Sequence, residues 1–234
     1  MSNKTNNLIF DFGFFNGDDT EYYLSNGFNV VALEANPVLY NEGLVKFRES
    51  INQQRLVLLN KAFNDDEQYT VDFYINESLP DTSTCDKSKT KFWGDAKIKT
   101  VSVDCIGYKS LINRFGKPYY IKCDIESLDY LLIKQIHETF ITPKYLSFEL
   151  SRFDYYKIFS YLYVSGYTKF QLINQTSLGD TFSKYSSGRF GHLLDDNWLD
   201  FDECLTRYMK YKELKAIDNK HLALGWVDIH ARID

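Results

Sequence analysis

Residues 8–36 constrain the fold more than any other stretch of the chain, because they read LIFDFGFFNGDDTEYYLSNGFNVVALEAN. An apolar run ends at Asp11, a turn with Gly13 and Gly17 follows, and a helix-length segment leads to a second apolar run that ends at Glu34. This order predicts a strand, a tight turn, a helix and a second strand with an acid at its tip. Such a unit is typical of nucleoside-binding sites, where the second acid accepts hydrogen bonds from ribose hydroxyls.

The residues of the turn bear on which nucleoside ligand fits. A dinucleotide fingerprint requires G-x-G-x-x-G, so that a pyrophosphate can approach bare backbone, but this turn offers only Gly13 and Gly17. Asp11, Asp18 and Asp19 surround it and would repel a pyrophosphate. S-adenosylmethionine, which carries a sulfonium and an ammonium and no phosphate, fits an acidic turn better. The two later acids also suit the first turn of a helix, and both interpretations hold together.

Five short motifs resemble, in the same order, those of the FkbM family of methyltransferases. They are Asp11-Phe12-Gly13, Glu34-Ala35-Asn36-Pro37, Val101-Ser102-Val103-Asp104, Lys122-Cys123-Asp124-Ile125-Glu126 and Ser147-Phe148-Glu149. The resemblance covers roughly residues 7–150 and becomes weaker toward the C-terminus. It implies an S-adenosylmethionine-dependent methyltransferase.

Two positions depart from the family's pattern. Phe14 and Phe15 stand where the family usually has small residues, and Ser127 stands where it usually has glycine. The phenylalanines are expected to narrow the methionine end of the pocket, and the serine to cap the next helix. These departures motivate an alternative function, a non-catalytic module that binds the cofactor without turnover.

The rest of the chain alternates between strand-like and helix-like segments. Buried strands are expected at 7–11, 29–34, 55–63, 118–123, 145–150 and 167–174, and helices at 18–27, 38–51, 105–115, 127–139 and 152–165. Residues 220–233 alternate like an antiparallel edge strand. The fold class predicted is therefore α/β, with a Rossmann-like, seven-stranded, mostly parallel sheet, helices on both faces and an antiparallel C-terminal strand.

Two segments interrupt this rhythm. Residues 69–77 alternate like a short antiparallel strand at the surface, and residues 78–95 are polar with one proline and one glycine. The second segment is expected to be a mobile loop that either closes over substrate or is a plain excursion.

Length and composition limit the remaining possibilities. A chain of 234 residues with 44% hydrophobic residues is expected to form a single domain over residues 1–234, with a cofactor-binding part at 7–150 and a C-terminal part at 151–234 that carries a substrate loop at 176–200. The net charge of −5 argues against a general nucleic-acid binder. The four cysteines form no C-x-x-C pair, and neither a signal core nor a membrane span is visible, so a cytoplasmic protein is expected.

Ligands of open α/β sheets bind beyond the carboxyl ends of the strands, and four acids fall there: Asp11, Glu34, Asp124 and Glu149. We expect Glu34 to hold the ribose hydroxyls, and Asp11 to orient the turn or face the methionine ammonium. The full set of expected cofactor-binding residues is Asp11, Gly13, Gly17, Glu34, Asn36 and Phe63, the last two beside the adenine. Phe63 is at least as easily explained as a core residue.

Lys122 and Asp124 are two positions apart, so on a strand their side chains share one face. We expect Asp124 to act as the catalytic base and Lys122 to tune it, although a structural ion pair would look the same. A divalent metal is left open, because Asp124 with Glu149 or Glu126 offers the hard oxygen ligands that such ions take. The glycine-containing segment 186–192 is either an ordinary surface turn, which is slightly favoured, or a loop whose Arg189 and His192 contact a substrate.

The function predicted is an S-adenosylmethionine-dependent O-methyltransferase that acts on a hydroxyl of a small molecule or a glycan. The other alternative besides the non-catalytic module is a nucleotide-dependent oxidoreductase on a similar sheet, which the missing third glycine argues against. The sequence does not distinguish sugar, lipid or peptide acceptors or O- from N-methylation, and it leaves the oligomeric state open.

Overall fold

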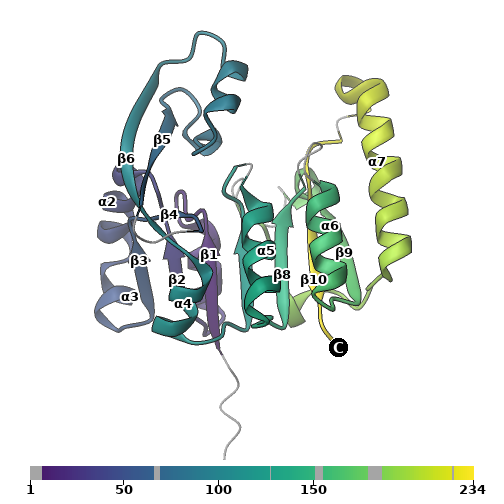
Figure 1. Ribbon diagram of the computed structural model, residues 1–234, viewed down its shortest axis with the longest axis horizontal. Coiled ribbons are helices and arrows are strands. Elements are labelled where there is room, and N and C mark those ends of the chain that lie inside the picture. The colour runs from purple at the N-terminus through teal and green to yellow at the C-terminus, as the bar shows by residue number, and fades with distance from the viewer. Residues whose placement is uncertain (1–6, 66–68, 127, 151–154, 179–185, 223) are drawn as a thin grey trace, which may run out of the picture.

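The computed structural model describes residues 7–65, 69–126, 128–150, 155–178, 186–222 and 224–234. Its centre is a seven-stranded sheet in the order β3-β2-β1-β7-β8-β10-β9 (Figure 1). The strands are β1 (Leu8–Phe12), β2 (Asn29–Leu33), β3 (Leu56–Leu59), β7 (Tyr120–Cys123), β8 (Tyr145–Glu149), β9 (Lys169–Asn174) and β10 (Val227–Arg232). Neighbouring strands run parallel, except that β10 is antiparallel to both β8 and β9. The predicted fold class is confirmed by this order and these directions.

The strand order reverses at β1. The chain builds outward from β1 to β2 and β3, and then returns to place β7 on the other side of β1. In open α/β sheets such a reversal leaves a crevice above the carboxyl ends of the two central strands. The fold therefore provides a binding position beyond Phe12 and Cys123, the last residues of β1 and β7.

Helices cover both faces of the sheet. One face packs against α4 (Tyr108–Phe115), α5 (Asp129–Thr139), α6 (Tyr155–Val164) and α7 (Phe201–Leu222), and the other against α1 (Asp18–Ser25), α2 (Pro37–Lys46) and α3 (Arg48–Asn52). On this second face, Phe190 and Trp198 of the segment after β9 join the apolar cluster. Each face thus has its own apolar layer, as the near-continuous apolar strands require.

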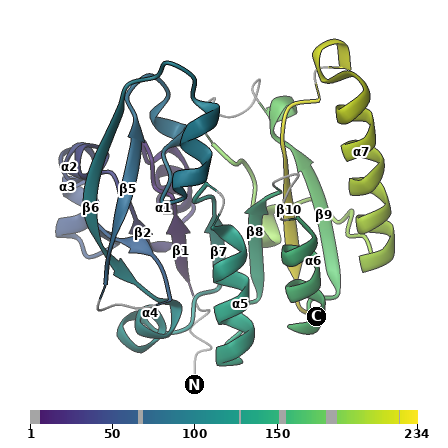
Figure 2. The same ribbon diagram turned by 45° about the horizontal axis from the view of Figure 1, so that its top comes forward.

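A second, three-stranded sheet stands beside the main one, in the order β4-β6-β5. Its strands are β4 (Ala62–Phe63), β5 (Thr70–Asn76) and β6 (Ile98–Ile106), and β5 and β6 pair antiparallel. Between β5 and β6 lie the 3₁₀ helices η1 (Pro80–Thr82) and η2 (Lys87–Phe92), which rise over the carboxyl ends of the central strands (Figures 1 and 2). Two more short 3₁₀ helices, η3 (Gln175–Leu178) and η4 (Gly191–Leu193), follow β9.

Three expectations are corrected by the structure. The C-terminal strand is antiparallel but lies inside the sheet between β8 and β9, so its expected place at the edge was wrong. The segment expected as one strand at 55–63 is two strands that belong to different sheets, because β4 leaves β3 to pair with β6. The expected loop at 78–95 contains two 3₁₀ helices.

None of the helices in the described ranges combines the length and the apolar character needed to cross a bilayer.

Candidate active site

A cavity of about 320 Å³ lies above the carboxyl ends of the central strands, at the reversal of strand order. The turn after β1 and the tip of β2 form one wall, and residues 80–83 and 85 of the segment between β5 and β6 form another. The remaining wall carries residues from the C-terminal part of the chain: Gln175, Ser186, Ser187, Trp226 and Asp228. Its size suits a small molecule.

Gly13 allows the turn after β1 to approach β7 closely. Its φ of 88° is in the left-handed region, and a Cβ built there would lie 1.9 Å from the carbonyl oxygen of Asp124. The amides of Gly13 and Phe14 both donate to the carbonyl of Leu33, which ties the turn to β2. Only glycine meets both the steric and the conformational requirement here.

The other residues of this turn have different roles. Gly17 has a φ of 81°, and a Cβ there would meet the rings of Phe47 and Phe14 at 2.5 and 2.6 Å, so this glycine serves packing and does not line the cavity. Phe14 is buried against Phe47 with the rings edge to face. Phe15 lines the cavity with a φ of 50°. Phe14 also lines the cavity, but its burial makes it chiefly a core residue.

Glu34 lies at the tip of β2 and lines the cavity. Its Oε2 accepts a hydrogen bond from the amide of Phe15 at 2.7 Å, and its Oε1 accepts one from the amide of Asn36 at 2.7 Å. Each oxygen retains a second lone pair for a ligand. Burial raises the pKa of this carboxyl to about 7, and the two amide hydrogen bonds offset part of that rise.

Two other residues expected beside the cofactor lie around Glu34. Asn36 caps α2, because its Oδ1 accepts a hydrogen bond from the amide of Val38, and it does not line the cavity. Its own amide helps to fix Glu34. Phe63 lines the cavity, but it is buried and stacks on Phe12 with ring centroids 5.1 Å apart, so it also has the core role considered above.

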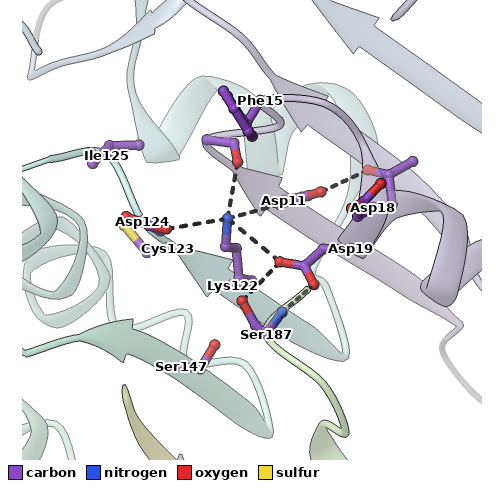
Figure 3. A network of polar contacts seen from close by, with 12 residues as sticks. Asp11, Phe15, Asp18, Asp19, Lys122, Cys123, Asp124, Ile125, Ser147 and Ser187 are labelled. Atoms are coloured by element: carbon purple, nitrogen blue, oxygen red, sulfur yellow. Dashed lines mark hydrogen bonds and ion pairs between the residues drawn. The ribbon is translucent and has the colours of Figure 1, made fainter. Parts of the chain in front are cut away.

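Lys122 is the centre of a buried polar network (Figure 3). Its Nζ donates to the carbonyl of Gly13 at 2.9 Å. The carboxylates of Asp19, Asp11 and Asp124 lie 3.7, 3.8 and 3.8 Å from the same atom. Burial lowers the pKa of this ammonium, but the surrounding carboxylates, Asp124 foremost, outweigh burial and raise it. Lys122 therefore stays protonated and cannot act as a base.

Asp11 lies beneath the cavity and does not line it. It is fully buried, and its Oδ2 accepts a hydrogen bond from the hydroxyl of Thr20 on α1 at 2.6 Å. Burial raises its pKa to about 6, and the ammonium of Lys122 limits the rise. Of the two roles expected for Asp11, this position favours orienting the turn and α1.

Three carboxylates lie close together where β7 and β8 end. Asp124, Glu126 and Glu149 each offer an oxygen, and these oxygens lie within 4.8 Å of one another. Burial and then the charge of Asp124 raise the pKa of Glu126 to about 8. Burial, followed by the charges of Asp124 and Glu126, raises the pKa of Glu149 well above its ordinary value. Such a cluster is costly when fully ionised, so it is suited to hold protons or a cation.

Several cavity residues were not found by sequence reasoning. Asp228 on β10 is buried, and its Oδ2 accepts a hydrogen bond from the side chain of Gln175 at 2.6 Å. Asp19 on α1 was noted only as part of the acidic turn, but it faces Ser186 and Ser187 across the cavity wall. Pairing between distant segments positions these residues, and no local motif in the sequence marks it.

The expected substrate segment at 176–200 reaches the cavity only in part. Ser186 and Ser187 line it, whereas Arg189 pairs with Asp195 at 3.0 Å and His192 hydrogen-bonds the hydroxyl of Tyr119 at 2.7 Å, both outside the cavity lining. Residues 179–185 and Ser127 lie outside the described residues.

Comparisons with known proteins give similarities of structure alone. No family model matches the sequence, and no curated protein matches it, so membership of the FkbM family is not confirmed. The solved structures that it resembles include a precorrin-6y C5,15-methyltransferase from Geobacter metallireducens, with 10% identity, a TM-score of 0.45, and 98% of this chain and 80% of that chain covered.

Two further solved structures show how varied the similar proteins are. One is the O-methyltransferase part of StiE, with 8% identity, a TM-score of 0.47 and coverage of 97% of this chain and 67% of that chain. The other is SpnF, a [4+2]-cyclase, with 10% identity, a TM-score of 0.41 and coverage of 97% and 75%. At these values the similarities decide nothing about the reaction of this chain, which has to be argued from its own site.

Proposed function

We propose that this protein is an S-adenosylmethionine-dependent methyltransferase that transfers a methyl group to a hydroxyl of a small molecule or a glycan. The observation that carries the proposal is Glu34. Two backbone amides fix its carboxylate at the tip of β2, in the same cavity as the Gly13 turn and Asp124. A carboxylate at that position is the group that accepts hydrogen bonds from the hydroxyls of a ribose.

The cavity supplies contacts for each part of the cofactor. Glu34 would hold the ribose, the part of the Phe63 ring that lines the cavity would contact the adenine, and the Gly13 turn would contact the methionine part. Carboxylates outnumber cationic groups along the lining, which suits the positive charges of S-adenosylmethionine and disfavours the pyrophosphate of a dinucleotide.

The chemistry asks little of the protein beyond alignment. The sulfonium makes the methyl group electrophilic; the acceptor oxygen forms a bond to the methyl carbon as the carbon–sulfur bond breaks, and S-adenosylhomocysteine leaves. Asp124, whose side chain is 41% exposed and lies 3.8 Å from the ammonium of Lys122, would take the hydroxyl proton.

A divalent cation is a separate part of the proposal. Asp124, Glu126 and Glu149 present the carboxylate oxygens that Mg²⁺ or Ca²⁺ prefers, and a bound ion would offset the burial and the repulsion from Asp124 that raise the pKa of Glu126. If the reaction uses the ion, adding a chelator lowers turnover and adding Mg²⁺ restores it. Turnover that is indifferent to both would remove the metal from the mechanism.

The direct test is isothermal titration with S-adenosylmethionine. We expect binding by the wild type and at least about a tenfold loss of affinity in Glu34→Ala, since hydrogen bonds to a charged group contribute about 1.5–3 kcal/mol each. Glu42→Ala is the matched control, because Glu42 is exposed on α2 and does not line the cavity. Equal affinity in the wild type and Glu34→Ala would remove the basis of the proposal.

The same sample separates the two alternatives. An oxidoreductase would bind a nicotinamide dinucleotide in place of S-adenosylmethionine. A non-catalytic module would bind S-adenosylmethionine but release no S-adenosylhomocysteine when a panel of hydroxylated acceptors is supplied. Acceptor-dependent release of S-adenosylhomocysteine would exclude the module.

A further inference from the structure

We propose that Asp19 is a positioning residue that holds one wall of the cavity against the Gly13 turn. We further propose that cofactor binding at this turn and the conformational order of that wall are coupled. The wall is the serine segment, defined here as residues 186–190. The coupling rests on the proposed function, whereas the fastening itself does not.

The contacts between Asp19 and the serine segment bring together parts of the chain that are far apart in sequence. Oδ1 of Asp19 accepts hydrogen bonds from the amide of Ser187 at 2.6 Å and from the hydroxyl of Ser186 at 3.1 Å. Its Oδ2 accepts a third from the hydroxyl of Ser187 at 2.8 Å (Figure 3). Hydrogen bonds to a carboxylate are about twice as strong as those between neutral groups. Asp19 is only 5% exposed, so water competes little for its oxygens.

Asp19 belongs to the cofactor side of the site. It lies in the first turn of α1, directly after the turn that contains Gly13 and Gly17. Its Oδ2 is 3.7 Å from Nζ of Lys122, and the same Nζ donates to the carbonyl of Gly13 at 2.9 Å. One buried network therefore joins the turn, α1, β7 and the serine segment, so displacing any of these disturbs the same hydrogen bonds.

The rest of the serine segment has an apolar anchor. Phe190 is buried, with its ring centroid 4.7 Å from that of Tyr23 and 4.9 Å from that of Tyr120. Ser186 and Ser187, by contrast, line the cavity and are joined to α1 chiefly through Asp19. The aromatic anchor fixes one end of the segment, and Asp19 sets the position of the end that faces a ligand.

A ligand that orders the Gly13 turn would therefore also order the serine segment. Coupling of this kind is reciprocal. If the bound cofactor slows amide exchange in the segment by a given factor, loosening the segment weakens cofactor affinity by the same factor. This predicts an effect of Ser186 and Ser187 on cofactor affinity that is distinct from any direct contact of Asp19 with the cofactor.

Amide hydrogen exchange of residues 186–190 tests the fastening without any ligand. We expect Asp19→Asn to accelerate exchange at Ser187 by about tenfold or more, because a charged hydrogen-bond acceptor is lost. Asp18→Asn is the matched control on the same helix, since the Asp18 carboxylate pairs with Lys46 on α2 at 3.5 Å, and it should leave the exchange unchanged. Unchanged exchange in Asp19→Asn would overturn the proposal.

The double variant Ser186→Ala/Ser187→Ala tests the coupling and also serves if Asp19→Asn does not fold. It removes two of the three hydrogen bonds and leaves Asp19 beside Lys122. Saturating S-adenosylmethionine should slow exchange in the wild type at least about threefold more than in this variant, and the variant should bind the cofactor more weakly by the same factor. Equal protection in both proteins would overturn the coupling. A wild type that binds no S-adenosylmethionine would overturn the proposed function and the coupling, while exchange without ligand still decides the fastening.

Discussion

At the scale of single residues, the site depends on carboxyl groups whose pKa is raised by burial and lowered by hydrogen bonds and a nearby ammonium. Glu34 is buried, which favours its neutral form, but it accepts hydrogen bonds from two amides, which favour the charged form. The outcome, a pKa of about 7, places its change of charge near neutral pH. If Glu34 pairs with the ribose hydroxyls in its ionised form, as proposed, cofactor binding depends on pH.

This gives a prediction for cofactor affinity. With a pKa of about 7, Glu34 is mostly protonated at pH 6 and mostly ionised at pH 8, so S-adenosylmethionine should bind about tenfold more tightly at pH 8. Titration calorimetry at several pH values measures this. In Glu34→Gln, whose side chain does not titrate, the affinity for S-adenosylmethionine should be weaker and should change little between pH 6 and pH 8. A wild-type affinity that is the same at both pH values would contradict the assignment of Glu34.

At the scale of elements, the turn after β1 shows how local sequence can determine a site. Gly13 is needed because the turn passes against the carbonyl of Asp124 at the end of β7. Gly27 also has a positive φ of 84°, but a Cβ there would meet nothing within 4 Å. The two glycines thus separate the cost of backbone conformation from the cost of a steric clash.

The comparison of these glycines is the second prediction. Gly27→Ala should lower the free energy of unfolding by about 1–2 kcal/mol, the usual cost of a left-handed residue with a Cβ. Gly13→Ala should cost about 2 kcal/mol more and abolish S-adenosylmethionine binding, because the added Cβ forces the backbones of β1 and β7 apart. Chemical denaturation and calorimetry provide both values. Equal stability of the two variants would show that the approach of Gly13 to Asp124 is not as close as described.

The elements that the sequence predicts well are those with a local cause. β1, α1 and β2 follow from apolar runs, a glycine turn and an acidic first turn, and they lie where they were expected. β10 was placed at an edge because its alternation resembles a half-exposed strand. That alternation has another cause, since the polar residues Asp228 and His230 are buried in a strand that has neighbours on both sides. The sequence did not predict α7, because no apolar periodicity marks this helix. It did not predict β6 either, because this strand starts with exposed residues.

The candidate site divides in the same way. Glu34, Gly13, Lys122 and Asp124 come together because parallel strands bring their carboxyl ends to one edge, which the sequence pattern predicts. The contacts of Asp19 with Ser186 and Ser187, and of Asp228 with Gln175, depend on how distant segments fold over that edge. Gly17, Asn36 and Asp11, expected at the ligand, support the site from outside the cavity lining.

At the scale of the whole molecule, a row of buried polar residues crosses five neighbouring strands. In register, it comprises Asp11, Lys122, Ser147, His230 and Gln171. Four of them have hydrogen bonds, with Thr20, Gly13, Tyr120 and Asp195 respectively. His230 is the exception, because within the described residues neither ring nitrogen has a hydrogen-bond partner. Burial lowers its pKa to about 4, so it is neutral in the folded protein.

This histidine predicts a loss of stability in acid. The unfolded chain binds a proton at His230 near pH 6.5, whereas the folded chain does so only near pH 4, so the folded state loses stability as the pH falls through that interval. Across this interval the free energy of unfolding falls by about 3 kcal/mol, because each unit of pKa difference corresponds to about 1.4 kcal/mol. In His230→Leu this part of the pH dependence should vanish. Denaturant unfolding from pH 7 to pH 4.5 measures it, and parallel curves for both proteins would contradict the burial of a neutral histidine.

The central claim is the proposal that the cavity above β1, β2 and β7 holds S-adenosylmethionine, with its ribose at Glu34 and its methionine part at the Gly13 turn. A crystal structure of the protein soaked with S-adenosylhomocysteine tests it most directly. The account predicts both ribose hydroxyls within hydrogen-bonding distance of the Glu34 carboxylate, and the sulfur on the side of Lys122 and Asp124. A ligand bound elsewhere, or one in this cavity with its ribose turned away from Glu34, would contradict the account.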